Sequence, residues 1–449
     1  MTTFNYNYEK FSLEKMESWS EKELSQFLIL DYFSASRKLG YKAPKKAILD
    51  ALQRSIQRYN QYKFILFFLD KFISKFFKNK IEKRKKILFR PFKYYNIILG
   101  EKKYYQVALI VHGNWDRLFA IKNFMDYMAT DDLDQYILAY LKEKDIKYLH
   151  RLIKEIESKL KASRPDYIVL WNDITPMERA IVLVSKKLGI TTLEIQHGAY
   201  DLFNLETGKV VDYVLAWGEY SKNLCVQQYK RKPEDIYVLG YPYMIKGNEE
   251  IKKPVVESSA HYRAGKNNHY MVCYLGQNFE IYNKKFLNIK IETIKKINEI
   301  CNKLGIDFIY RPHPGDNRES LRKNLSDIQF TNIKEGLEET FKKADIFISF
   351  NSTALVEAAM SSKISLQLLN YPIKSDNLER LGACSKSFET IEELEDYLKK
   401  IARAKNLKEF KTKFNNDYVE TRYNPIERFS EIIKDIEKRK YEPPHHNKL

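Results

Sequence analysis

The stretch from Asp345 to Met360, DIFISFNSTALVEAAM, holds a strand, a turn and a helix in 16 residues. Its first part, Asp345–Ser349, is a short apolar run, which is typical of a strand buried on both faces. The polar turn Asn351-Ser352-Thr353 follows, and Ala354–Met360 has a helical composition. Because a strand followed at once by a helix is the repeating unit of parallel sheets, this stretch predicts an α/β fold.

The same order of apolar run, polar turn and helix recurs on both sides of this stretch. These runs are Val107–Val111, Asp166–Trp171, Thr191–Ile195, Tyr213–Trp217 and Ile236–Leu239, and then Tyr270–Leu275, Asp307–Tyr310 and Ser365–Leu369. Strands that alternate with helices favour parallel, doubly wound sheets. We therefore expect a pair of Rossmann-like domains of the GT-B type, with an added N-terminal helical region.

Polar, aperiodic residues at 246–268 divide the strands into two groups. The predicted organisation is listed in chain order. It comprises a basic helical N-terminal region over 1–100, a first Rossmann-like (acceptor) domain over 101–245, a linker over 246–268, a second (nucleotide-donor) domain over 269–405, and C-terminal helices and a tail over 406–449. Two such domains leave a cleft at the carboxyl ends of their strands, where open α/β sheets bind ligands.

Positive charge is concentrated near the start of the chain. Residues 1–100 hold 21 Lys and Arg against 9 Asp and Glu, an excess of 12 within a total excess of 18. Phe68, Phe72 and Phe76 lie on one helical stripe, and the basic run Lys83–Lys86 follows. This pattern fits either a core helix with a solvated basic end or an interfacial helix on an anionic membrane. No nucleic-acid recognition motif is present, so we expect no nucleic-acid partner.

The chain has no run of 18 apolar residues and no charged-then-apolar signal pattern at its start. Its four cysteines are scattered without metal or disulfide spacing, which is typical of a reducing compartment. We expect a cytoplasmic protein, with peripheral contact to the inner face of the plasma membrane as an option.

Two loops in the second half carry the features of a phosphate site. Arg311-Pro312-His313-Pro314 follows a strand, and its Arg and His can donate hydrogen bonds to phosphate. Asn351-Ser352-Thr353 precedes a helix whose exposed amides attract anions. Glu357, one turn further, is placed to accept from ribose hydroxyls, and Gly276-Gln277 lets a donor approach closely. A proline turn and a helix cap are the alternative interpretations of these loops.

Three loops in the first half offer a general base. His197 follows a strand within Gln196-His197-Gly198, and a His there can take a proton from a hydroxyl nucleophile. Asp173 precedes a helix, where it either caps that helix or contacts the acceptor, the cap being favoured. Asp116 follows His112-Gly113, and either His112 or Asp116 reaches the predicted cleft. All these segments follow predicted strands, which favours one shared site.

Taken in order, these motifs resemble bacterial capsule and surface-polysaccharide GT-B transferases, a group that includes polysialyltransferases, Kdo-type transferases and teichoic-acid polyol-phosphate transferases. The resemblance covers roughly residues 105–400. The segments that carry it are Pro165-Asp166, Glu178-Arg179-Ala180, Gln196-His197-Gly198, Ala216–Glu219, Gly240-Tyr241-Pro242, Arg311–Pro314 and Ser349–Thr353. It implies that His313, Ser352 and Thr353 hold the phosphates of a nucleotide-activated sugar, with a CMP-linked donor favoured, and that His197 is the base. Gln196-His197-Gly198 stands where sialyl- and Kdo-type relatives carry an acidic motif.

The function expected from this resemblance is inverting, metal-independent sugar transfer to a surface polysaccharide or lipid-linked glycan. No metal site and no cofactor is expected, because no Asp-x-Asp motif of the GT-A kind is present and the nucleotide-sugar is itself the substrate. A CDP-polyol phosphotransferase of the teichoic-acid type is one alternative. A UDP-sugar 2-epimerase-like enzyme is another, although Asn351-Ser352-Thr353 lacks the glycines of the epimerase turn. A degenerate, non-enzymatic scaffold is the third.

Overall fold

The computed structural model describes residues 20–30, 49–50, 52–57, 59–62, 84–91, 94–112, 114–200, 209–243, 270–281, 285–332, 334–404 and 406–441. The predicted linker over 246–268 and the aromatic stripe of Phe68, Phe72 and Phe76 lie outside these residues. Among the described residues, no helix has the length and apolar character that crossing a bilayer requires.

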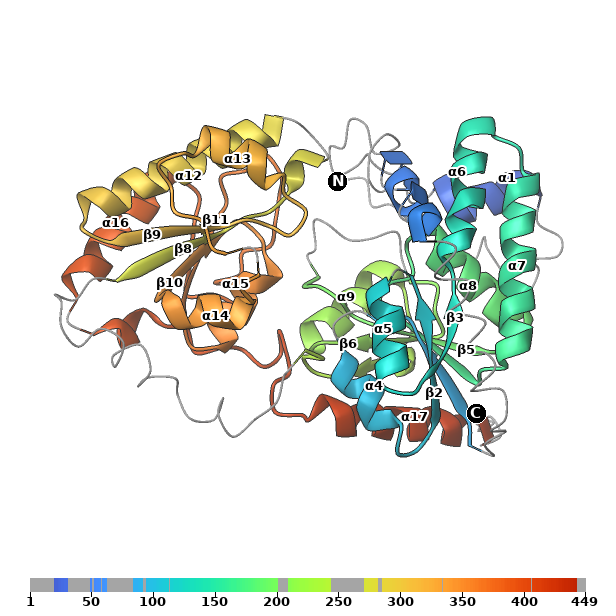
Figure 1. Cartoon of the computed structure of the whole chain (residues 1–449). Helices are drawn as coiled ribbons and strands as arrows, with labels where there is room; N and C mark the ends of the chain where they lie inside the picture. Colours follow the sequence, from blue (N-terminus) through green and yellow to red (C-terminus); the bar gives the residue numbers. More distant parts are fainter. Residues whose placement is uncertain are drawn as a thin grey trace.

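The first domain is built on a parallel sheet of seven strands (Figure 1). In spatial order the strands are β3 (Asp126–Ala129), β2 (Gln106–Val111), β1 (Lys86–Phe89), β4 (Tyr167–Leu170), β5 (Thr191–Ile195), β6 (Tyr213–Ala216) and β7 (Ile236–Val238). Every strand pairs in parallel with its neighbours. Such pairing requires crossover connections, which is why strands and helices alternate along the chain.

Helices cover both faces of this sheet. The connecting helices are α4 (Tyr95–Glu101), α5 (Asn114–Lys122), α6 (Asp134–Glu143), α7 (Lys147–Ser163), α8 (Pro176–Lys187) and α9 (Glu219–Tyr229). The short N-terminal helix α1 (Glu21–Ser25) continues through a π-helical turn, Gln26–Leu30. Phe27, Leu28 and Ile29 of this turn join the core beneath α6, α7 and α8. The opposite face is covered by α4, α5 and the C-terminal helix α17 (Pro425–Tyr441).

The second domain repeats this architecture with five parallel strands. In spatial order they are β12 (Lys386–Phe388), β11 (Ile364–Leu368), β10 (Ile346–Ser349), β8 (Met271–Leu275) and β9 (Asp307–Arg311). Its helices are α12 (Lys285–Lys303), α13 (Arg318–Asn324), α14 (Leu337–Lys343), α15 (Thr353–Met360) and α16 (Ile391–Arg403). The expected pair of doubly wound parallel sheets is therefore confirmed.

Three strands were not expected, namely β1, β3 (Asp126–Ala129) and β12 (Lys386–Phe388), and β1 alters the predicted domain organisation. We assigned residues 1–100 to a helical region, but Lys86–Phe89 forms β1 at the centre of the first sheet, between β2 and β4. The strand is only four residues long and follows a basic run, so its pattern resembled the end of a helix. The first domain consequently begins before residue 101.

After α16 the chain crosses back from the second domain to the first. The Tyr220 amide donates to the Asp417 carbonyl at 2.8 Å, and the Glu420 amide donates to the Trp217 carbonyl at 2.8 Å. At Gly218 an added Cβ would lie 2.6 Å from the Asp417 carbonyl oxygen, so only glycine allows this crossing. The returning segment thus ties the two domains together on the strand-end side of β6.

The end of the chain docks on α4 through a buried carboxyl group. Glu101 is fully buried, and its Oε1 accepts from the Ser430 hydroxyl at 2.6 Å. Its Oε2 has no hydrogen-bond partner among the described residues. Burial raises the pKa of Glu101 to about 7, although Ser430 and Lys434 partly oppose this shift.

This raised pKa predicts a loss of stability as pH increases. The folded protein holds the proton more tightly than the unfolded chain, so the contribution is full below the ordinary glutamate pKa and is lost as pH rises to about 7. Between pH 4.5 and 8 the loss is about 3 kcal/mol. We expect Glu101→Gln to remove this dependence in urea unfolding. Glu319→Gln at an exposed position is the control, and parallel pH curves for Glu101→Gln and the unsubstituted chain would contradict the assignment.

Candidate active site

In each sheet, the direction in which successive strands are added reverses at one point, called the switch point. In the first sheet, β1 is the starting strand and lies between β2 and β4; in the second, β8 lies between β9 and β10. Loops on the two sides of such a point run in opposite directions and leave a crevice at the carboxyl ends of the strands. Arg90 and Trp171 follow β1 and β4, and Gly276 and Phe350 follow β8 and β10. Most of the candidate residues lie around these two points.

In the second domain, Gln277 joins the two loops at the switch point. Its Oε1 accepts from the Asn351 amide at 3.0 Å, and its Nε2 donates to the Asn351 carbonyl. An added Cβ at Gly276 would lie 2.5 Å from the Tyr310 hydroxyl and 3.1 Å from the His313 amide nitrogen. Gly276 therefore permits its own loop to pack, and Gln277 fixes Asn351, rather than either residue leaving space for a donor.

Arg311 is turned toward its own domain. Its guanidinium donates to the Thr340 hydroxyl at 2.6 Å, to the Glu335 carbonyl at 3.1 Å and to the Gly336 carbonyl at 3.4 Å. These contacts use hydrogen-bond donors of the guanidinium group that we expected to hold phosphate. Arg311 thus fixes the start of α14 in this structure, and we revise its expected role to positioning.

His313 is the exposed member of the same loop. Its Nδ1 accepts from the Gly315 amide at 3.0 Å, so in the neutral ring the proton lies on Nε2, which is then a donor. Its backbone amide donates to Asp316 at 2.9 Å, and buried Lys290 contacts the same carboxylate at 2.9 Å. A rigid support therefore presents a hydrogen-bond donor at the end of β9.

The amino end of α15 meets the first domain. Ser352 is the N-cap, and its hydroxyl accepts from the Ala354 amide at 3.2 Å. The Thr353 hydroxyl oxygen accepts from the Ala199 amide of the first domain at 3.3 Å. An added Cβ at Gly198 would lie 3.7 Å from the same oxygen. The loop that carries His197 and the predicted phosphate turn are therefore in direct contact.

Glu357 makes a second connection between the domains. Its negative charge lies close enough to the Tyr241 and Tyr243 hydroxyls to contribute to the raised pKa of both. Burial, together with the negative charge of Glu357, raises the pKa of Tyr241 well above its usual value. In this conformation Glu357 therefore faces two tyrosines of the first domain. A ribose would have to share or replace these contacts.

The loop of His197 is held at every position. The Gln196 side chain accepts from the Trp217 amide at 2.8 Å and donates to the Gly198 carbonyl at 2.8 Å. The His197 carbonyl accepts from the Tyr243 hydroxyl at 2.9 Å, and its ring packs edge-on against Trp171 at 5.1 Å. A rigid loop of this kind holds a side chain in one orientation, which catalysis requires of a base.

Asp173 does not cap α8 as expected. It is fully buried, and its Oδ2 accepts from the Val210 amide and, at 3.2 Å, from the Val211 amide. The turn before α8 is instead stabilised by Asn172, whose Oδ1 accepts from the amides of residues 174 and 175 at 3.0 and 3.2 Å. The helix-cap prediction for Asp173 is wrong for this structure because its carboxylate faces inward, whereas the contact with an acceptor stays a prediction.

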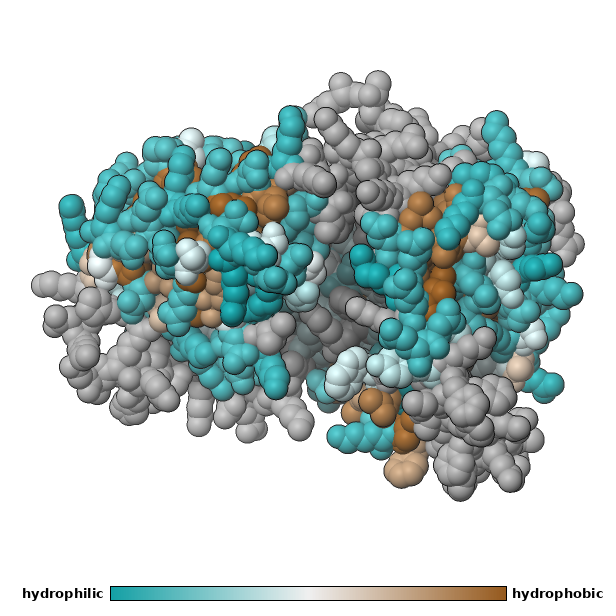
Figure 2. Space-filling view, turned by 45° about the horizontal axis from the view of Figure 1, so that its top comes forward, coloured by the Kyte–Doolittle hydropathy of each residue, from teal (hydrophilic) through white to brown (hydrophobic). Residues whose placement is uncertain are grey.

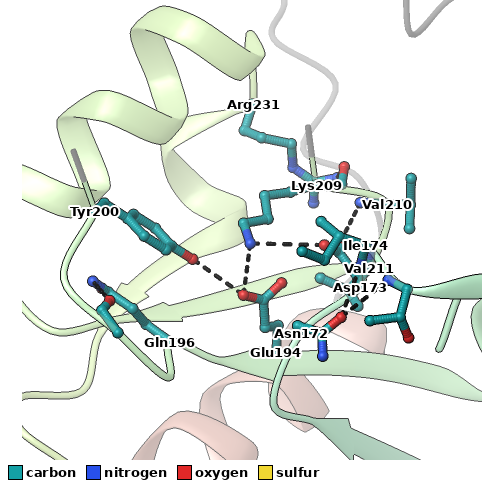
Figure 3. Close-up of polar contacts among 12 residues, drawn as sticks. Asn172, Asp173, Ile174, Glu194, Gln196, Tyr200, Lys209, Val210, Val211 and Arg231 are labelled. Carbon is teal, nitrogen blue, oxygen red and sulfur yellow. Dashed lines mark hydrogen bonds and ion pairs between the residues drawn. The ribbon is translucent and has the colours of Figure 1, made fainter. Parts of the chain in front are cut away.

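Lys209 lies at the centre of the buried cluster that contains Asp173 (Figure 3). Its Nζ is 2.7 Å from Glu194 Oε1 and 3.7 Å from Asp173 Oδ1, and all three side chains are fully buried. The Tyr200 hydroxyl donates to the same Glu194 oxygen at 3.1 Å. Since Tyr200 lies three residues after His197, this cluster anchors the His197 loop from inside the first domain.

Asp116 lies in the first turn of α5, after β2. It accepts from the Tyr95 hydroxyl at 3.3 Å and from the His112 amide at 3.4 Å, and burial raises its pKa. Tyr94 lies within electrostatic reach of both Tyr243 and Asp116, so Asp116 is on the same side of the domain as the His197 loop. His112 points elsewhere, since its Nε2 is 3.3 Å from Asp134 Oδ2.

The ion pair between Arg90 and Glu178, at the switch point of the first sheet, was not predicted from the sequence. Arg90, directly after β1, donates to Glu178 Oε1 at 3.1 Å and to the Thr130 hydroxyl at 3.0 Å, and it is almost completely buried. Its position was hidden because β1 itself was not predicted. Glu178 formed part of a quoted motif, but no partner could be assigned to it from sequence spacing.

Comparisons with solved structures agree on the fold. The chain is similar to UDP-GlcNAc 2-epimerase from Methanocaldococcus jannaschii in complex with UDP-GlcNAc and UDP, with a TM-score of 0.52 and 18% identity over 78% of this chain and 99% of that one. MnaA from S. aureus with UDP gives 0.55 and 14%, covering 80% and 99%. The wall teichoic acid polymerase TagF gives 0.46 and 13%, covering 88% and 99%.

Together with the two parallel sheets, the likenesses to the M. jannaschii and S. aureus structures show that the chain has the GT-B fold, as expected. Identities below 20% show the fold alone. No protein-family model matches the sequence, and no curated protein matches it.

Proposed function

We propose that this chain is an inverting glycosyltransferase that moves a sugar from a nucleotide-activated donor to a surface polysaccharide or lipid-linked glycan. The observation that carries the proposal is the 3.3 Å contact between the Ala199 amide and the Thr353 hydroxyl oxygen. It brings the predicted base loop and the predicted phosphate turn to one place between the two domains. A CMP-linked donor is favoured by the resemblance of the motifs. The proposed location of the protein is the cytoplasm.

The proposed donor site lies at the amino end of α15. Ser352, Thr353 and the amides of the first helical turn would donate to the nucleotide phosphates, because a helix amino end attracts anions. The Nε2 proton of His313 would add a further donor from the end of β9. Arg311, Gln277 and Asn351 would keep these two loops in place.

The proposed reaction needs one proton acceptor. His197 would take the proton of the acceptor hydroxyl while the oxygen of that hydroxyl bonds to the anomeric carbon of the donor sugar. The bond from that carbon to the phosphate oxygen breaks, and the nucleotide leaves with its negative charge stabilised by the donor-site hydrogen bonds. Asp116, whose pKa is raised by burial, is the remaining alternative base in the first domain.

A UDP-sugar 2-epimerase is the second candidate, because the M. jannaschii and S. aureus structures with UDP share the fold at TM-scores of 0.52 and 0.55. A CDP-polyol phosphotransferase is the other alternative. Incubation with CMP-, CDP-, UDP- and GDP-linked donors separates the three. Acceptor-dependent release of nucleotide from a nucleotide-sugar supports sugar transfer, and acceptor-dependent release of CMP from a CDP-polyol supports the phosphotransferase. Epimerised UDP-sugar without acceptor supports the epimerase, and no reaction of any donor contradicts the proposal.

Nucleotide binding should depend on Ser352 beyond its effect on stability. We expect Ser352→Ala to weaken binding by roughly tenfold, the value of one hydrogen bond to a charged group, in calorimetric titrations of CMP, CDP, UDP and GDP. Thr390 is the matched control, because its hydroxyl caps α16 through the Glu393 amide at 3.2 Å. Both substitutions should cost about 1 kcal/mol of stability. Equal nucleotide affinity in the two variants would contradict the donor site.

A further inference from the structure

Exposed apolar side chains gather in one part of the first domain. Figure 2 shows apolar side chains interrupting the hydrophilic surface of this lobe. Among the described residues, the large apolar or aromatic side chains that are exposed are Tyr62, Leu99, Tyr104, Trp115, Leu118, Phe124 and Tyr423. Five of these seven lie between residues 99 and 124. Scattered single residues would need no explanation, but such concentration does.

The remaining exposed residues of this stretch are all lysines. Between residues 99 and 124, with 113 and 114 left aside, they are Lys102, Lys103 and Lys122. The stretch contains two carboxyl groups, and neither is exposed: Glu101 is fully buried, and Asp116 is partly buried against Tyr95. The outward face of this stretch is therefore apolar and positively charged, without exposed negative charge.

These residues form one surface, which we call the α4–α5 surface: Leu99, Lys102, Lys103, Tyr104, Trp115, Leu118, Lys122 and Phe124. Trp115, Leu118 and Lys122 are three and four residues apart on α5, which places them on one side of the helix. Lys102 Nζ donates to the Asn123 carbonyl at 2.6 Å and thereby joins the end of α4 to the end of α5. Figure 1 shows the two helices side by side on the same lobe.

Phe124 is not explained by the fold. Its φ is 52°, in the left-handed region, and its side chain is 79% exposed. Glycine or asparagine fits this backbone conformation with less strain than a bulky side chain does. A phenylalanine held in this way contributes nothing to the core, so its contribution has to come from something that covers the surface.

We propose that the α4–α5 surface binds the surface of an anionic lipid bilayer. Trp, Tyr and Phe with neighbouring lysines are the residues that occupy the boundary between acyl chains and headgroups, where rings are half-buried and ammonium groups meet lipid phosphate. A second copy of the chain fits less well, because a two-fold interface would place the lysines of one copy against those of the other. The occupant is thus the negatively charged membrane.

This inference goes beyond the proposed function and gives it a spatial basis. Trp115 precedes Asp116 in the first turn of α5, directly after β2. The α4–α5 surface therefore starts beside the carboxyl ends of the strands and extends along α5 toward the amino ends of the strands. A bilayer bound there would bring a lipid-linked acceptor to the open side of the first domain.

The test uses the full chain and vesicles of phosphatidylglycerol and phosphatidylcholine, with pure phosphatidylcholine vesicles as the neutral case. We expect sedimentation with the anionic vesicles that falls as salt rises. The combined change of Trp115→Ser, Leu118→Ser and Phe124→Ser should weaken partitioning by roughly tenfold or more. Tyr62→Ser removes an exposed aromatic ring that is not part of the α4–α5 surface and should leave binding unchanged.

A second readout locates the contact. Brominated lipids quench only tryptophans that enter the bilayer, so Trp115→Phe should abolish most of the quenching while the protein still binds. Binding of the triple variant equal to that of the unsubstituted chain, or quenching unchanged in Trp115→Phe, would overturn the proposal. A dimer that the triple variant converts to a monomer, seen by sedimentation velocity, would also overturn it. None of these measurements requires a nucleotide, so failure of the proposed transfer reaction is distinguishable from failure here.

Discussion

Replacing His197 with alanine is expected to lower the rate of sugar transfer by roughly a hundredfold to ten-thousandfold, the usual contribution of a general base. The loop that presents this side chain is fixed by Trp217, by Tyr243 and by the Thr353 contact across the domains. The substitution leaves these three contacts of the loop in place, so nucleotide affinity should stay the same. The measurement is single-turnover release of nucleotide with acceptor present, across a range of pH.

Two comparisons make this result specific. His150 is exposed on α7, so His150→Ala is the matched control and should not change the rate. Asp116→Asn tests the alternative base, whose pKa burial raises. A large rate loss in Asp116→Asn with a normal rate in His197→Ala would transfer the role to Asp116. Equal losses of nucleotide affinity and rate in His197→Ala would indicate a disturbed loop instead of a missing base.

The fold could be predicted because its signal is local. In Asp345–Met360 the apolar strand, the polar turn and the helix follow one another within the same few residues, and this pattern needs no knowledge of distant partners. β1 shows the limit of such reasoning. Lys86–Phe89 has three apolar residues after a basic run, and its central place in the sheet depends on pairing with β2 and β4.

For the candidate site, the sequence predicted which residues follow the strands, but not the direction in which their side chains point. The sequence placed Arg311, His313 and Asp173 at strand ends, which is where the structure has them. Whether each side chain faces the crevice depends on distant partners. Arg311 is turned by the segment 335–340, and Asp173 by the amides of Val210 and Val211. Separations of 24 residues or more carry no periodic signal, so a phosphate ligand and a structural anchor look alike in the sequence.

Lys209→Met is expected to destabilise the chain by about 3–5 kcal/mol, the cost of breaking a buried ion pair by removing one partner. Lys209 Nζ is 2.7 Å from Glu194 and 3.7 Å from Asp173, and all three side chains are 0% exposed. Without the lysine, these two buried carboxylates lose the cation that they share. The measurement is the free energy of unfolding from urea denaturation at neutral pH.

The matched control is Lys187→Met, because Lys187 contacts Glu157 at 3.1 Å while being 37% exposed, and a surface pair contributes at most about 1 kcal/mol. Lys209→Met combined with Glu194→Gln should recover part of the lost stability, since it removes one of the unpaired charges. A loss for Lys209→Met no larger than that of Lys187→Met would contradict the assignment. Because Tyr200 joins Glu194 to the His197 loop, the same variant should also lower the transfer rate at temperatures where it remains folded. That effect would connect the buried cluster to the proposed base through a single hydrogen bond.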